Sequence, residues 1–337
     1  MPEIPYLKGL NHLTFYYDEE KLHDKLEECG RRLSESTQYK LTVDSVLLDS
    51  FHSATIEGAR TTIENVKRAL KSPETKSDKM VVNIIHALDM IYSGSMITKE
   101  NIRNLWEVVV KDVCENKGIA GTHYRAGDVY VSSLERIVHT PAPFHELSDY
   151  MNSLFAFLNS QEIEPLLKGI LSHFYFVYVH PFCDGNGRTA RILQNYCLFQ
   201  GGYEGVRRIR ISQAINMHLG AYYKVLEQVE QPQMQAGKAV LNLTAFIDYM
   251  LERIIEACSL AEKKQYSLSE NEKRLLLRMT RKGLGAEITA AKASDMLGMT
   301  AADAVTLLNG LASKGYLLQE KQIDGKMLYR LLLLVTE

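Results

Sequence analysis

The sequence predicts a mainly α-helical protein with a small mixed α/β unit at its carboxyl end. Apolar residues recur at three- and four-residue spacing through about the first 260 positions, which is the period of a helix with one buried face. Beyond that region, three short helical patterns precede two strand-like runs. Of the 337 residues, 46% are apolar and 24% are charged, so the chain has enough hydrophobic material for folded cores.

Glycine and proline separate the helical patterns of the larger region. The first strong pattern begins near Leu41 and ends at Gly58, a residue type that commonly stops helices. The strand-like segment of this region is Asp128–Ser132, and Gln228–Gly237 is the expected long loop. Further helices are expected at Asp78–Ser93, Thr98–Val113, Phe144–Leu158, Ile163–Val179 and Gly187–Phe199.

The carboxyl-terminal region resembles a winged helix-turn-helix domain in the order of its elements. Helices are expected at Glu270–Arg281, Ala290–Leu297 and Ala301–Ser313, and Asp324–Gly325 is a typical hairpin turn between two strands. The third helix would be the recognition helix, yet it carries Asp303 and no basic residue. DNA readers depend on basic or amide side chains there, so protein interaction or dimerisation is favoured and DNA binding is the lesser alternative. The two strands are expected at Tyr316–Gln322 and Lys326–Leu333.

Charge and cysteine content exclude several classes of protein. Lys and Arg total 39 against 41 Asp and Glu, so no global field draws the chain to nucleic acid or to an anionic membrane. The five cysteines form no CxxC pair, which argues against a disulfide framework and favours a reducing, cytoplasmic location. The most apolar stretch, 165–182, includes Lys168 and two histidines and is too short and too polar to span a bilayer. No membrane partner is expected.

The segment His180–Arg191, HPFCDGNGRTAR, combines the residue types that phosphoryl chemistry needs. His180 follows an apolar helix and can take a proton from a nucleophilic hydroxyl near neutral pH. Asp184 offers a hard oxygen ligand for Mg²⁺. The glycine turn after it places backbone N–H groups at the start of a new helix, where anions are favoured. Arg188 and Arg191 lie one helical turn apart and can both face that anion.

These positions resemble the HxFx(D/E)GNGRxxR signature of Fic-domain proteins, and eight fixed positions would match by chance with a probability of roughly 10⁻⁸. The resemblance implies a Fic helical bundle with a β-hairpin flap and a protein adenylyltransferase that moves AMP from ATP to a Ser, Thr or Tyr hydroxyl with the help of Mg²⁺. It implies His180 as general base, Asp184 as metal ligand and Phe182 as a core residue that fixes the loop. The implied nucleotide-binding residues are Gly185, Asn186, Gly187, Arg188 and Arg191, joined by Tyr222 and Tyr223.

Residues Gly121–Val131 are similar to the Fic flap, whose strand edge would pair with an extended segment of an unidentified protein substrate. Such main-chain pairing makes little demand on the target's sequence. The implied docking residues are Tyr124, Arg125, Val129, Tyr130 and Val131.

Ser53, Glu57 and Gly58 resemble the inhibitory (S/T)xxxE(G/N) motif that accompanies many Fic domains. In that interpretation Glu57 pairs with Arg191 and occupies the place of the γ-phosphate of ATP. Some relatives use this glutamate to remove AMP, so a net AMP-removing hydrolase is one alternative function. A nucleotide-sensing, DNA-binding regulator is the other alternative.

The resemblance, together with a change of sequence pattern around Lys263–Leu268, divides the chain into four regions. Residues 1–95 form an N-terminal helical region with the inhibitory helix, and 96–230 form the Fic catalytic core. Residues 231–264 form a helical extension or linker, and 265–337 form the winged helix-turn-helix domain. A homodimer and self-modification are further expectations, whereas the target protein, the modified residue and the signal that relieves inhibition are not encoded in a readable pattern.

Overall fold

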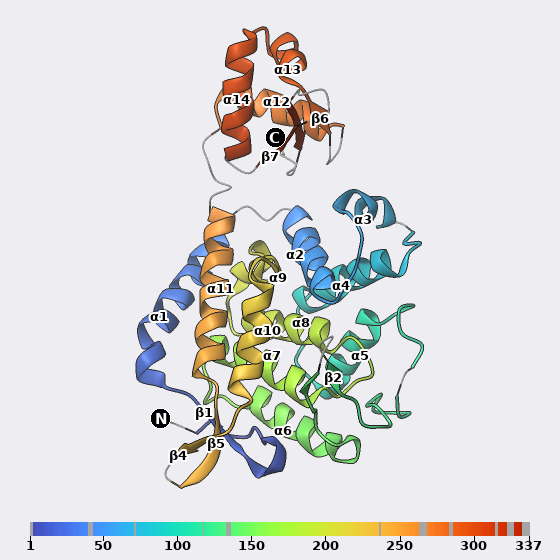
Figure 1. Cartoon of the computed structure of the whole chain (residues 1–337), viewed down its shortest axis with the longest axis vertical. Coiled ribbons are helices and arrows are strands. Elements are labelled where there is room, and N and C mark those ends of the chain that lie inside the picture. The colour runs from blue at the N-terminus through green and yellow to red at the C-terminus, as the bar shows by residue number, and fades with distance from the viewer. Residues whose placement is uncertain are drawn as a thin grey trace. The chain divides into compact units, whose positions relative to one another are not determined.

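The computed structural model shows two compact units, Met1–Ser259 and Leu260–Glu337. The first is mainly helical, which confirms the predicted fold class (Figure 1). No helix in the described part of the chain is long and apolar enough to cross a membrane. The structure describes residues 3–39, 43–70, 72–116, 118–132, 136–235, 237–262, 268–282, 286–313, 316–321 and 327–331.

Helices α7 (Pro165–Val179) and α8 (Asn186–Gln200) lie at the centre of the first unit. Twelve of the 15 residues of α7 are buried, which is why its sequence is apolar on every side. Proline at its first position fits a helix start, and the Glu164 carboxylate accepts a hydrogen bond from the Leu167 N–H. The short turn between α7 and α8 carries the segment that the sequence marks as functional.

The surrounding helices bring distant parts of the sequence to α8. Helix α2 packs against α4 and α9, while α4 and α5 pack against α8. Threonine side chains cap the starts of α3, α4 and α5 by accepting a backbone N–H, which explains where these helices begin. The helices around the central pair are α1 (Glu19–Glu35), α2 (Val43–Ile56), α3 (Ile63–Ala69), α4 (Lys76–Tyr92), α5 (Lys99–Val109), α6 (Leu147–Asn159), α9 (Ile211–Met217), α10 (Leu219–Val229) and α11 (Thr244–Glu262).

The first unit contains more β-structure than the sequence predicts. Strand β1 (Thr14–Tyr16) pairs in parallel with β5 (Lys238–Asn242), which pairs antiparallel with β4 (Gln233–Gln235). Strand β4 lies within Gln228–Gly237, so the prediction of a loop there is wrong. Its sequence, Gln-Met-Gln, has no β-branched or aromatic residue, and the pairing with β5 decides its conformation instead.

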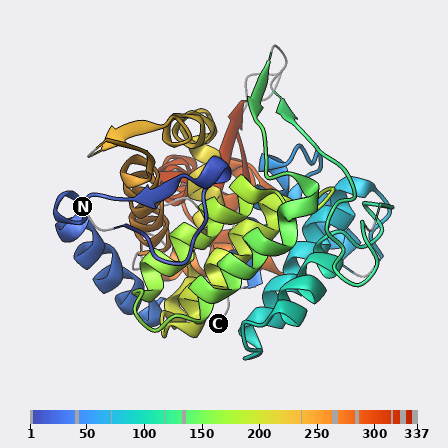
Figure 2. The same ribbon diagram turned by 90° about the horizontal axis from the view of Figure 1, so that it is seen from below.

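A second small sheet is the hairpin of β2 (Val131–Ser132) and β3 (Ile137–His139), which projects from the helical body in Figure 2. The strand predicted at Asp128–Ser132 is thus shortened to its last two residues. At the base of the hairpin, the His139 ring lies 2.6 Å from a carboxylate oxygen of Glu230 and 2.7 Å from the carbonyl oxygen of Tyr178. These contacts fix the hairpin to α10 and α7.

In the second unit, α12 (Glu270–Thr280), α13 (Ala290–Leu297) and α14 (Ala301–Ser313) lie where helices are predicted. Strands β6 (Glu287–Ile288), β8 (Met327–Leu331) and β7 (Leu317–Lys321) form a sheet in that spatial order, and β6 is absent from the prediction. A capping box between Ser269 and Glu272 starts α12. The predicted turn at Asp324–Gly325 lies outside the described residues, and the winged-helix assignment stays a prediction.

Candidate active site

The turn between α7 and α8 has two residues in the left-handed backbone region. His180 ends α7 with a φ of 52°, and its N–H donates to the Phe176 carbonyl at 3.0 Å. Gly185 begins α8 with a φ of 81°, and a Cβ there would lie 2.7 Å from Cγ1 of Val110. A side chain at Gly185 would therefore collide as well as strain the backbone. The turn leaves the unpaired N–H groups of the first turn of α8 next to His180 in sequence.

His180 has the protonation state of a base. Its Nδ1 lies 3.2 Å from the Val177 carbonyl oxygen, and because a carbonyl only accepts, Nδ1 carries the hydrogen and Nε2 keeps its lone pair. Burial lowers the pKa of the imidazole to about 4, against the opposing effect of the Val177 hydrogen bond. The ring is therefore neutral at pH 7 and able to accept a proton.

Arg125 is buried behind this turn, which argues against its predicted role as a docking residue of the flap. Its side chain is 2% exposed, and its guanidinium donates to the carbonyl oxygens of His180, Gly127 and Ala142, the first two at 2.9 and 2.8 Å. Its backbone N–H donates to the Pro181 carbonyl at 2.9 Å. A planar guanidinium with five donors suits a position where several backbone carbonyls converge. Arg125 therefore holds the backbone at His180 in place.

The other predicted flap residues divide into two groups. Tyr124 packs against Phe182 with ring centroids 5.9 Å apart, and burial raises its pKa to about 12, so it belongs to the support of the loop. Tyr130 is 60% exposed, and Val129 and Val131 are partly exposed. Arg125 is thus the one of the five predicted residues that is fully buried, and Tyr130 is the most exposed of them.

The side chain of Asn186 faces away from the predicted phosphate cradle. Its Oδ1 accepts the Phe182 N–H at 3.0 Å, and its Nδ2 donates to the Phe182 carbonyl at 2.8 Å. Both groups of the amide are thus used to close the loop. The prediction that Asn186 binds nucleotide therefore applies to its backbone N–H alone.

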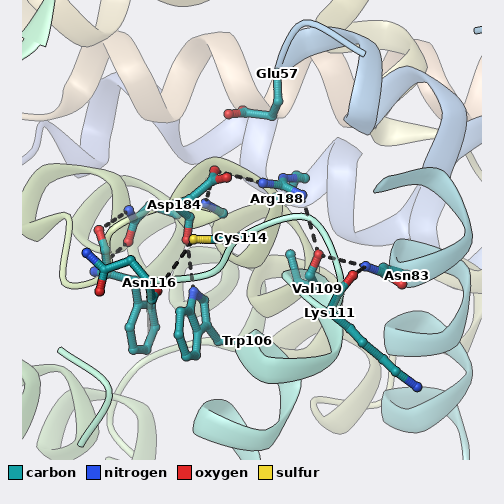
Figure 3. Close-up of polar contacts among 12 residues, drawn as sticks. Glu57, Asn83, Trp106, Val109, Lys111, Cys114, Asn116, Asp184 and Arg188 are labelled. Carbon is teal, nitrogen blue, oxygen red and sulfur yellow. Dashed lines mark hydrogen bonds and ion pairs between the residues drawn. The ribbon is translucent and has the colours of Figure 1, made fainter. Parts of the chain in front are cut away.

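Asp184 and Arg188 form an ion pair in which the arginine is buried and the carboxylate is accessible. Arg188 Nη2 donates to Asp184 Oδ1 at 2.8 Å, and the exposed fractions of the two side chains are 1% and 39% (Figure 3). Arg188 Nη1 donates to the Val109 carbonyl at 3.3 Å, whereas Nε is buried without a hydrogen-bond partner among the described residues. The pair therefore combines a fixed positive charge with a carboxylate that solvent can reach.

The donor set at Asp184 fits Mg²⁺ held together with a nucleotide. Mg²⁺ is commonly bound by one or two carboxylates plus phosphate oxygens and water. Asp184 supplies one carboxylate, and the described part of the chain holds no cluster of three His, Cys, Asp or Glu side chains that could bind a metal by itself. The site suits a metal that arrives with phosphates rather than a permanently bound ion.

The carboxylate of Glu57, which follows α2, lies against the first turn of α8. Its Oε1 accepts a hydrogen bond from Arg191 Nη2 at 2.9 Å, and the three atoms nearest to a Cβ built at Gly187 all belong to the Glu57 carboxylate. Arg191 also donates from Nε to Ser53 Oγ and from Nη2 to the Ser53 carbonyl, both at 2.9 Å. A carboxylate therefore occupies the position where the helix dipole and a buried arginine favour an anion.

The two predicted nucleotide-binding tyrosines differ in environment. Tyr222 is buried, and its hydroxyl lies 2.9 Å from Nε2 of His173, whose Nδ1 lies 2.7 Å from Oε1 of Gln194. Tyr223 is half exposed, and its hydroxyl donates to the Ile56 carbonyl at 3.1 Å. Tyr222 thus belongs to a buried polar chain, and Tyr223 is tied to the end of α2.

Sequence reasoning missed the anchor that holds α2 in place. Asp49 is fully buried, and its carboxylate accepts the N–H of Ser212 at 2.7 Å and its hydroxyl at 3.0 Å. Burial raises the pKa of Asp49 to about 6 despite these bonds. An aspartate within an apolar helical stripe is the one signal that could have found it, because a buried carboxylate needs a partner.

Comparison with known proteins agrees with the signature in the turn. Residues 96–198 match the model of the Fic/DOC family. The chain is 26% identical over 275 residues to protein adenylyltransferase Fic of Nematostella vectensis, covering 77% of this chain and 60% of the relative. It is 29% identical over 167 residues to protein adenylyltransferase Fic of Drosophila willistoni, covering 46% and 32%. A Fic family protein from Desulfovibrio desulfuricans G20 has a TM-score of 0.61 at 20% identity, covering 96% of this chain and 99% of that one.

These findings show a Fic domain within the chain and a fold of the Fic type. The chain spans less than two thirds of the length of both named relatives.

Proposed function

We propose that this protein is an adenylyltransferase that moves AMP from ATP to a Ser, Thr or Tyr hydroxyl of a protein. The observation that carries the proposal is the turn between α7 and α8. A neutral histidine whose Nε2 carries no proton precedes a helix start lined by two buried arginines there. The names of the similar proteins support the same activity.

In the proposed reaction the target hydroxyl oxygen forms a bond to the α-phosphorus of ATP, and the bond from that phosphorus to the bridging oxygen of the β-phosphate breaks. Pyrophosphate leaves, and the hydroxyl proton moves to Nε2 of His180. The N–H groups at the start of α8, with Arg188 and Arg191, would bind the phosphates and stabilise the charge that develops there. Asp184 would hold Mg²⁺, which supplies further neutralisation of phosphate charge.

The target segment would dock at the β2–β3 hairpin. Tyr130 and Ile137 expose 60% and 54% of their surface there, although large apolar side chains are usually covered. An extended peptide could pair with a strand edge and pack against these side chains, which would place its hydroxyl near His180. The hairpin is anchored through His139, so it would act as a fixed docking edge.

We further propose that Glu57 inhibits the transfer reaction. Its carboxylate already uses the Arg191 guanidinium and lies against Gly187, where the γ-phosphate would need the same positive charge. Two negative groups cannot share that position, so ATP would bind with its phosphates out of line for attack. The Ser53 contacts to Arg191 and the Asp49 contacts to Ser212 would keep the inhibitory helix in register.

For the second unit we propose a protein-binding role. Helix α14 has Asp303 as its single charged residue, and its exposed surface includes Ala301, Val305 and Thr306. A helix of this composition has little to offer phosphates or base edges. We therefore expect this unit to bind another protein and not to bind DNA.

The test is transfer of label from α-labelled ATP to protein in the presence of Mg²⁺. Wild type, Glu57→Gly and Glu57→Gly/His180→Ala are compared, and His23→Ala in the Glu57→Gly background controls for loss of an imidazole, because His23 is exposed on α1. Label should rise in Glu57→Gly, persist with His23→Ala and vanish with His180→Ala. Equal labelling with and without His180 would refute its role as the base.

The alternative of AMP removal is tested on protein that already carries labelled AMP. Faster release of label by wild type than by Glu57→Gly would favour the hydrolase, because the glutamate would then orient water. Unchanged release would leave the transferase as the function of the site.

A further inference from the structure

The single tryptophan of the chain, Trp106 on α5, contacts the catalytic turn at two points. Its indole N–H donates to the carbonyl oxygen of Asp184 at 2.9 Å. Its ring stacks on Phe182 with centroids 4.3 Å apart and an interplanar angle of 16°. Trp106 is fully buried. The backbone of Asp184 therefore has a fixed position relative to α5.

Asn83 on α4 makes the matching contact on the other side of the ion pair. Its Nδ2 donates to the carbonyl oxygens of Lys111 at 2.8 Å and Val109 at 3.3 Å. Val109 is the last residue of α5 and Lys111 lies just beyond it, so both carbonyls are at a helix end, where helical N–H partners run out. The Val109 carbonyl also accepts Arg188 Nη1 at 3.3 Å, so Asn83 fixes the acceptor that holds the arginine.

The two contacts are the ends of one hydrogen-bonded chain, drawn in Figure 3. Asn83 holds the Val109 carbonyl, that carbonyl and the Asp184 carboxylate hold Arg188, and Trp106 holds the Asp184 backbone. Asn83 is 7% exposed, and Arg188 and Trp106 are less exposed still, so water is poorly placed to replace a lost bond. Loss of either end would loosen the pair in the middle.

We propose that Asn83 and Trp106 are positioning residues for the site at which Asp184 and Arg188 receive Mg²⁺ and the phosphates of ATP. The inference rests on the proposed function and goes beyond the signature, because Asn83 also lies outside the residues that match the family model. If Asn83 and Trp106 contributed only by packing, side chains of similar size without N–H groups would leave the site unchanged. Here the N–H groups are directed at the backbone of the site itself.

We expect removal of either contact to lower the affinity of the site for Mg²⁺. Hydrogen-bonding partners of metal ligands typically change metal affinity by about 10- to 100-fold when they are removed. Trp106→Phe keeps an aromatic ring against Phe182 and removes the indole N–H, and Asn83→Leu removes both amide donors at similar volume. Each should raise the Mg²⁺ concentration needed for half-maximal binding of ATP by about tenfold.

The experiment measures binding without turnover. Isothermal titration of α,β-methylene ATP at a series of Mg²⁺ concentrations is performed on Glu57→Gly protein and on the same protein with Trp106→Phe or Asn83→Leu. Asn83→Ser serves if the leucine variant does not fold. Tyr196→Phe is the matched control, because it removes the hydroxyl of a fully buried aromatic residue on α8, which donates to Ser95 Oγ at 3.1 Å.

A selective rise in the Mg²⁺ requirement, with Tyr196→Phe equal to the parent, supports the inference. Equal Mg²⁺ requirements in all folded variants would overturn it and leave the proposed function intact. No Mg²⁺-dependent binding by the Glu57→Gly parent would instead overturn the proposed function, so the two failures are distinguishable.

Discussion

The position of Glu57 can be tested without an activity assay by adding one methyl group at Gly187. A Cβ there would lie 2.9 Å from Glu57 Cδ and 3.2 Å from Oε2, with Oε1 closer still. The carboxylate must therefore move when alanine is introduced. Moving it weakens the 2.9 Å bond to Arg191, whose side chain is only 3% exposed.

The sign of the effect of Gly187→Ala depends on whether Glu57 is present. Within a helix, alanine in place of glycine stabilises by up to about 1 kcal/mol. A hydrogen bond between charged groups contributes about 1.5–3 kcal/mol, so its loss outweighs that gain. We expect Gly187→Ala to destabilise wild type by about 0.5–2 kcal/mol and to stabilise Glu57→Gly by up to about 1 kcal/mol.

The assay is scanning calorimetry of wild type, the two single variants and the double variant, with the transition of the larger unit followed separately. For a unit of this size, 1 kcal/mol corresponds to about 2–4 °C in Tm. Gly220→Ala is the control, because Gly220 is likewise the second residue of a helix, α10, and a Cβ there meets nothing within 4 Å. Equal shifts for Gly187→Ala in both backgrounds would refute the placement of Glu57.

Three further outcomes follow from buried groups. Because burial lowers the pKa of His180 to about 4, the rate of AMP transfer by Glu57→Gly should stay level from pH 8 to about 5 and fall below pH 4. A fall in rate near pH 6.5 would contradict the role of buried His180 as the base. Arg125→Met should lower Tm and should lower the rate of AMP transfer at least about tenfold, because three backbone carbonyls lose their donor. An unchanged rate in the folded variant would show that Arg125 does not position His180. Burial raises the pKa of Asp49 to about 6, so protonation of Asp49 stabilises the fold below pH 4, and this stabilisation is lost as the pH rises through 6. Asp49→Asn should therefore reduce the change of Tm between pH 4 and 6, measured by calorimetry in matched buffers.

The sequence was sufficient for features whose parts are close together in the chain. The turn between α7 and α8 is encoded within twelve consecutive residues, because helix end, glycine turn and helix start are local events. The pairing of Glu57 with Arg191 was predicted across 134 positions only through the resemblance. Nothing in the spacing of the two residues would have joined them.

Features that depend on distant partners were not predictable from local patterns. Strand β1 is three residues long and pairs with residues more than 200 positions away, so it has no periodicity of its own to detect. Arg125 reads as a surface cation, and its burial follows from three carbonyls that only the folded chain brings together. The sequence pattern predicts the helix that contains Asn83, but it does not predict the carbonyl groups to which Asn83 donates.

The contact that would inhibit the enzyme also solves an electrostatic problem of the fold. Arg191 is buried, and its Nη1 has no hydrogen-bond partner in the described part of the chain. A buried charge without a counter-charge is costly, so the first turn of α8 requires an anion whether or not ATP is bound. Glu57 supplies that anion from within the chain, and the γ-phosphate would be its natural replacement. If Glu57 inhibits transfer as proposed, that inhibition and the neutralisation of buried Arg191 would be two effects of one ion pair.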